Sequence, residues 1–125
     1  MKRVIALALV VIATAMPAEE FYSSRYDNFD VDELIGNDRL MKSYNMCFLG
    51  VGKCTPEGSD FSKLMPEAVQ STCSKCTDKQ KVLIAKVMKA ISEKHTDDWE
   101  KLREKFDPEH KRDEDIKKFI KQYSA

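Results

Sequence analysis

The feature that most restricts how this 125-residue chain can fold is the placement of its four cysteines, which all lie between Cys47 and Cys76. Six residues separate Cys47 from Cys54, eighteen separate Cys54 from Cys73, and two separate Cys73 from Cys76. The same stretch contains two of the four prolines and three of the four glycines. Such a cluster is compatible with a zinc site, a redox-active thiol pair or structural disulfides.

The beginning of the chain predicts a secretory signal peptide. A short basic start precedes an apolar run from Val4 to Ala15. This run is shorter than the roughly 20 apolar residues that span a bilayer, and it fits the central region of a signal sequence. Cleavage after Ala15 fits the small-x-small rule, whereas cleavage after Ala18 would make residues 1–18 the signal peptide and residues 19–125 one domain. We therefore expect a secreted, extracellular protein.

The charge balance argues against a nucleic-acid partner. The chain has 21 basic and 21 acidic residues, and loss of Lys2 and Arg3 with the signal peptide would leave 19 basic residues and a formal charge of −2. Such a chain lacks the basic excess that proteins use to bind phosphate backbones. No later apolar run is long enough to anchor the chain, so we also expect no stable membrane insertion.

Secretion changes how the cysteines are interpreted. In an oxidising compartment, four cysteines favour two disulfides, for which three pairings exist. Cys73 and Cys76 are close enough to bridge across one turn, and two glycines between Cys47 and Cys54 permit the tight backbone of a small ring. Local pairing is therefore favoured. The chain-entropy model gives roughly 2.5 and 2 kcal/mol for these rings, against about 3.5 kcal/mol for a long-range pairing.

The remaining pattern predicts an all-α domain, because apolar residues recur at helical spacing and no segment alternates like a strand. The helices are expected at Val31–Ile35, Asp38 to about Phe48, Ser59 or Asp60 to Thr72, Lys79 to about Lys94, Asp97 to Phe106, and Asp113 to about Tyr123.

Capping residues and prolines mark where these helices should begin or break. Thr77 or Asp78 is expected to cap the fourth helix, and Asp97 the fifth. Pro66 lies inside the third helix and predicts a kink or break near Lys63–Met65, because proline cannot donate a backbone hydrogen bond.

Metal binding and catalysis have little support in the sequence. Only Cys73 and Cys76 have the two-residue spacing of a zinc-ligand pair, and a thioredoxin-like redox site would need strands that the pattern lacks. The two histidines, His95 and His110, lie in charged surroundings and in no motif that pairs them with a nucleophile. We therefore expect no enzymatic activity, no metal and no cofactor.

The helical stripes contain several methionines, which suit surfaces that repack around varied apolar partners. Periodicity alone nevertheless favours an ordinary solid core. It shows which face turns inward but not whether the interior is filled.

Several motifs together resemble the insect chemosensory protein family, also called olfactory-segment-D-like. The resemblance covers the whole expected domain and rests on the spacing C-x6-C-x18-C-x2-C and on the segments YSSRYDNFDVDELI (22–35), LMKSYNMCFL (40–49), GKCTPEG (52–58), LMPEAV (64–69), CSKCTDKQK (73–81) and DDWEKLREKFDP (97–108). One departure is Phe106, which stands where the family often has tyrosine.

The resemblance implies six helices around an internal apolar channel, sequential disulfides and cleavage after Ala18. It implies a carrier, expected to be a monomer, that reversibly binds fatty acids, long-chain alcohols, esters or other semiochemicals. Tyr44 would lie near the channel mouth. The expected ligand contacts are Tyr44, Met41, Phe61, Met65, Val69, Leu83, Val87, Met88 and Trp99. The alternative is a secreted interaction protein in development or defence, without a carrier role.

Overall fold

The computed structural model describes residues 27–125, which form six helices and no strand. The helices are α1 (Val31–Ile35), α2 (Asp38–Leu49), α3 (Pro56–Ser71), α4 (Asp78–Lys94), α5 (Thr96–Phe106) and α6 (Asp113–Tyr123). The all-α class is confirmed. The expected signal peptide and its cleavage sites lie outside the described residues.

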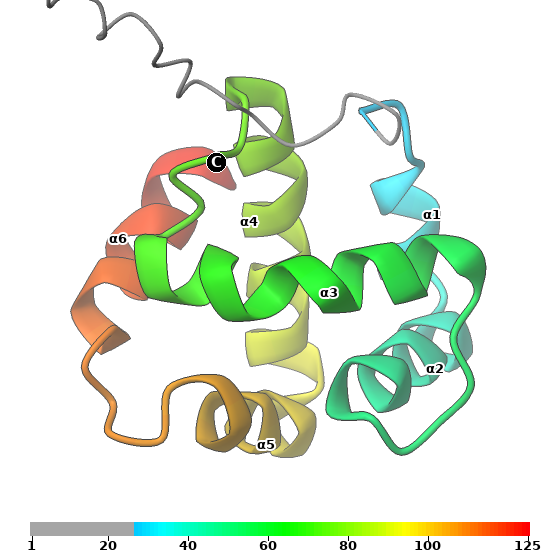
Figure 1. The fold of residues 1–125 in the computed structure, drawn as a ribbon. Coiled ribbons are helices and arrows are strands. Elements are labelled where there is room, and N and C mark those ends of the chain that lie inside the picture. Colours follow the sequence, from blue (N-terminus) through cyan, green and yellow to red (C-terminus); the bar gives the residue numbers. More distant parts are fainter. Residues whose placement is uncertain (1–26) are drawn as a thin grey trace, which may run out of the picture.

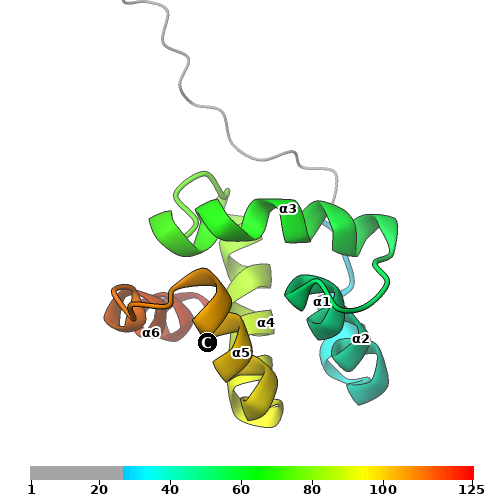
Figure 2. The ribbon, with the colours of Figure 1, turned by 60° about the horizontal axis from the view of Figure 1, so that its bottom comes forward.

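Helix α4 is the centre of the arrangement, and α1, α5 and α6 pack directly on it. Helix α2 packs against α1, α3 and α5. In Figures 1 and 2, α3 crosses the direction of α4 instead of running along it. The two longest helices of the described chain therefore face each other across the middle of the molecule without lying side by side.

Short polar side chains fix where four of the helices begin. Asp30 accepts a hydrogen bond from the backbone of α1, Asn37 from that of α2 and Thr55 from that of α3. At α4, Thr77 and Gln80 form a reciprocal capping box, which satisfies two backbone donors that the first turn leaves free. Of the two caps that the sequence allows, Thr77 and Asp78, the structure shows Thr77.

The start of α3 differs from the sequence prediction. The helix begins at Pro56, three residues before Ser59, because Thr55 caps it and proline fits the first helical position, where no backbone donor is required. It then continues to Ser71 without interruption, so a break near Lys63–Met65 is wrong, and the kink that the sequence also allowed there stays a prediction. Pro66 is exposed, and water can therefore hydrate the carbonyl that its missing N–H leaves free.

The start of α5 also differs. The helix begins at Thr96 after His95, whose side chain makes no capping hydrogen bond. The expected cap, Asp97, lies inside the first turn together with Asp98. Both carboxylates are still near the positive end of the helix dipole, where negative charge is favourable.

Both disulfides are local, as the sequence predicts. Cys47 is bonded to Cys54 and Cys73 to Cys76, with Cα–Cα distances of 5.0 and 5.2 Å. The first joins the last part of α2 to the residue two before α3. The second closes the turn from α3 to α4, where Thr72 and Cys73 both have positive φ. No described cysteine is free, so none is available as a thiolate ligand for zinc.

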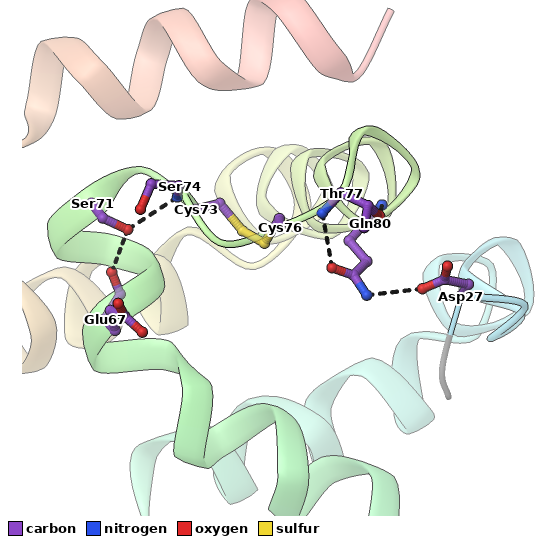
Figure 3. The surroundings of a disulfide bond; sticks show 8 residues. All are labelled: Asp27, Glu67, Ser71, Cys73, Ser74, Cys76, Thr77 and Gln80. Atoms are coloured by element: carbon purple, nitrogen blue, oxygen red, sulfur yellow. Dashed lines mark hydrogen bonds between the residues drawn. A yellow bond between two sulfur atoms is a disulfide. The ribbon is translucent and has the colours of Figure 1, made fainter. Parts of the chain in front are cut away.

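The second disulfide lies in a hydrogen-bonded corner, which Figure 3 shows. The hydroxyl of Ser71 donates to the carbonyl of Glu67 and accepts from the backbone of Ser74. Beyond the disulfide, the amide of Gln80 donates to Asp27 at 2.9 Å. The corner therefore also holds the beginning of the described chain.

A buried carboxylate joins α2 to α5. Asp98 is 1% exposed and accepts hydrogen bonds from Lys42 Nζ at 2.9 and 3.1 Å and from Asn45 Nδ2 at 3.0 Å. Burial raises the pKa of Asp98. The hydrogen bonds from Lys42 and Asn45 and the positive charges of Lys42 and His95 outweigh burial, and together they lower that pKa below its usual value.

This buried carboxylate makes the stability of the fold depend on pH. Because the folded-state pKa of Asp98 lies below the unfolded value of about 3.9, its contribution is complete above about pH 4 and is lost as the pH falls through the folded-state pKa. We expect Asp98→Asn to lower the free energy of unfolding at pH 7 by roughly 1–3 kcal/mol. At pH 3 the difference from the wild type should be smaller. Urea unfolding at both pH values measures it.

Asp97→Asn is the matched control, because Asp97 is exposed in the same turn. Its effect at pH 7 should stay below about 1 kcal/mol. If Asp98→Asn lowers the free energy of unfolding equally at pH 7 and pH 3, the lowered pKa of Asp98 is contradicted.

Candidate ligand-binding cavity

A cavity of about 420 Å³ lies between α3 and α4. Its volume is within the range of roughly 300–1,000 Å³ that is usual for small-molecule sites. The lining is mostly apolar and comprises Phe29, Val31, Leu34, Phe48, Asp60, Phe61, Lys63, Leu64, Met65, Ala68, Val69, Cys76, Gln80, Leu83, Ile84, Val87, Met88, Ile91, Trp99, Leu102, Arg103, Phe106 and Ile116.

One wall of the cavity is the inner stripe of α3. Phe61, Leu64, Met65, Ala68 and Val69 recur at intervals of three and four residues, which places them on one side of a helix. The ring of Phe61 packs edge-on against that of Phe29, with centroids 5.4 Å apart. The residues just before α1 therefore close this end of the wall.

The opposite wall is part of the wide apolar face of α4. Ala85 and Ala90 are buried, while the larger side chains of Leu83, Val87 and Met88 line the cavity and are only half-buried. Leu83 belongs to neither of the two core clusters. On α4, Ala85 and Ala90 thus pack in the core, whereas Leu83 borders the cavity without joining a core cluster.

Helix α5 supplies an aromatic side and a charged group. Trp99, Arg103 and Phe106 line the cavity, and the guanidinium carbon of Arg103 lies 5.9 Å from the centroid of the Trp99 ring. Arg103 forms an ion pair with Asp113, and its Nη2 lies 3.2 Å from Nδ1 of His110. These contacts hold the guanidinium between the cavity and the start of α6.

Seven of the nine ligand contacts expected from the sequence line this one cavity: Phe61, Met65, Val69, Leu83, Val87, Met88 and Trp99. The structure brings them together from three helices. Their contact with a ligand remains a prediction.

The other two expected contacts, Met41 and Tyr44, do not line the cavity. Both are buried in the core on α2, where Tyr44 accepts a hydrogen bond from the Thr55 hydroxyl at 3.2 Å and packs edge-on against Phe48. The inner stripe of α2 faces α1, α3 and α5, and Phe48 at its end is the α2 residue that reaches the lining.

The lining residue that sequence reasoning missed most clearly is Arg103. Its signal was its position four residues after Trp99, which places both on one side of α5. Because arginine is usually solvated, the search for apolar residues at helical spacing left Arg103 out.

Other kinds of site find no support in the described chain. Residues 27–125 contain no group of three or more His, Cys, Asp and Glu side chains that could hold a metal ion. None of the helices in that range is both long and apolar enough to cross a bilayer.

Known proteins are similar to this chain in sequence and in fold. Ejaculatory bulb-specific protein 3 of Drosophila melanogaster is 41% identical over 120 residues, covering 95% of this chain and 90% of that protein. A chemosensory protein solved in complex with bromo-dodecanol superimposes with a TM-score of 0.71 at 31% identity, covering 81% of this chain and 98% of the other. The antennal chemosensory protein A6 of the moth Mamestra brassicae gives a TM-score of 0.67 at 30% identity, covering 81% and 94%.

The insect pheromone-binding family A10/OS-D matches residues 22–114, which include both disulfides and most of the residues around the cavity. The chain therefore belongs to this family, the A10/OS-D or chemosensory protein family of insects.

Proposed function

We propose that this protein is a secreted carrier that reversibly binds small hydrophobic ligands in the cavity between α3 and α4. The observation that carries the proposal is the cavity itself, a space of about 420 Å³ with a mostly apolar lining inside a domain of about 100 residues. A well-packed domain of this size ordinarily has few voids larger than a water molecule.

The ligand would be held mainly by burial of its apolar chain. Each methylene moved from water into the cavity contributes about 0.8 kcal/mol, so a chain of moderate length supplies useful affinity without charged contacts. Long-chain alcohols, fatty acids, esters and other semiochemicals have this form. The similar chemosensory protein that was solved with bromo-dodecanol supports this class, as does the pheromone-binding description of the family.

The carrier needs no catalytic group, and we propose that it acts as a monomer outside the cell. Release of the ligand requires only that the apolar helices around the cavity move apart transiently. The two short disulfide rings leave α3 and α4 free to do so between their ends.

Displacement of a fluorescent apolar probe tests the proposal. With 1-alkanols of increasing length, we expect affinity to rise about fourfold per methylene, from the burial value above, until the chain fills the cavity. Failure of every alcohol, acid and ester to displace the probe from the folded protein would contradict the carrier role.

A larger side chain at Leu83 should block the cavity. Leu83→Trp adds volume to a wall residue outside the core clusters, so we expect at least a tenfold loss of dodecanol affinity with little change in thermal unfolding. Val82→Trp is the matched control, because Val82 is the neighbouring α4 residue and does not line the cavity. Equal losses of dodecanol affinity in both variants would show that any large side chain on α4 weakens binding, whether or not it enters the cavity.

Secretion predicts a defined amino terminus. When the full chain is expressed in insect cells, the protein in the medium should begin at Glu19, as intact mass and amino-terminal sequencing would show. A start at Met16 would instead indicate cleavage after Ala15. Leu9→Arg places a charge in the apolar run and should retain the protein in the cells; unchanged export would argue against a signal peptide.

A further inference from the structure

Arg103 is the one described residue that both lines the cavity and carries a buried side-chain atom without a hydrogen-bond partner. Its side chain is 14% exposed. The atom is Nε, an N–H donor. Burying a donor without an acceptor is unfavourable, and native structures rarely leave one in this state.

Another nitrogen of the guanidinium, Nη2, is already engaged. Asp113 is its ion-pair partner, and His110 lies within hydrogen-bond distance of Nη2. Trp99 lies beside it on the cavity side of α5. The charge of Arg103 is therefore compensated by Asp113, while Nε still lacks an acceptor among the described residues.

The other polar residues of the lining are less suited to receive a ligand. Gln80 is bonded to Thr77 and Asp27. Asp60 is not free and could not donate as a carboxylate. Lys63 is exposed, so its ammonium keeps its water.

We propose that Arg103 Nε donates a hydrogen bond to the polar head of the bound ligand, and that this head is an uncharged oxygen acceptor, a hydroxyl or a carbonyl. The inference rests on the proposed carrier function and names the chemical class of its ligand. An apolar chain fills the space between α3 and α4, and its oxygen reaches the donor on α5.

The charge balance at this end of the cavity is the reason for an uncharged head. A carboxylate head would share one guanidinium with the carboxylate of Asp113, and like charges that close repel. A hydroxyl or carbonyl oxygen accepts from Nε without disturbing the ion pair. Head-group selectivity thus follows from an arginine that is electrically neutralised but still has a free donor.

The test compares dodecanol, dodecane and dodecanoate on the wild type and on Arg103→Lys, by probe displacement at pH 7. Lysine keeps the positive charge opposite Asp113 but has a methylene where arginine has Nε–H. We expect dodecanol affinity to fall about tenfold in Arg103→Lys, as for loss of a hydrogen bond to a charged donor, and dodecane affinity to stay unchanged. The wild type should bind dodecanol more tightly than dodecanoate.

Lys63→Gln tests whether the head lies instead at the other cation of the lining, and Lys101→Gln, an exposed α5 residue outside the lining, is the control that should leave dodecanol binding unchanged. If Lys63→Gln loses the binding and Arg103→Lys keeps it, the head lies at α3 and the inference is wrong. Equal dodecanol affinity in the wild type and Arg103→Lys, or tighter binding of dodecanoate by the wild type, would also overturn it.

A second measurement needs no variant and decides the question if Arg103→Lys does not fold. In an ¹H–¹⁵N spectrum of the wild type, the Nε–H signal of Arg103 should move when dodecanol is added, and not when dodecane is added. No shift with dodecanol bound would reject the inference while the carrier function stands. If neither ligand displaces the probe from the wild type, the carrier function itself fails, and the inference with it.

Discussion

The structure depends on α3 being held at both of its ends. Cys54 precedes the helix and is bonded to Cys47 in α2, and Cys73 follows it in the turn that Cys76 closes before α4. The apolar stripe of α3 packs on α2 and α5 along part of its length, because burying apolar surface is favourable. Helix α3 crosses the direction of α4, as Figures 1 and 2 show, and Ala68 of α3 shares a core cluster with Ala85 of α4 and the second disulfide. The cavity lies between the apolar stripes of these two helices.

Polar contacts provide the second set of supports, and two of them end on the backbone of cavity-lining residues. Asp98 joins α5 to Lys42 and Asn45 of α2. Lys105 of α5 donates to the carbonyl of Phe48 near the end of α2, and Gln70 of α3 donates to the carbonyl of Phe106. Helix α5 is therefore fixed to both α2 and α3 by directional bonds. Such bonds fix the positions of these helices relative to one another, whereas apolar packing alone is not directional.

Contacts between helices also explain how the mostly apolar lining can contain the charged side chain of Arg103. Arg103 would be costly in an apolar lining by itself, because burying an unpaired charge is unfavourable. Asp113 at the start of α6 pairs with it and Trp99 covers its face. The charge is thus compensated by a residue outside the lining, while Nε has no partner among the described residues. In the proposed carrier, the choice of ligand would depend on a contact between α5 and α6 as much as on the walls.

The sequence by itself determined what local rules control. Helix positions followed from apolar spacing, and the cap of α4 was narrowed to Thr77 or Asp78. Both disulfides were expected to be local because short separations and nearby glycines allow small rings. The errors in predicting the start and continuity of α3 also had local causes. Thr55 and Pro56 start the helix early, and the exposed Pro66 does not break it. Tertiary structure alone decided the interior. Periodicity places Tyr44 and Leu83 equally on inward faces, yet one packs in a core and the other borders a cavity. The distance between two inward faces depends on how their ends are joined, which no single helix encodes.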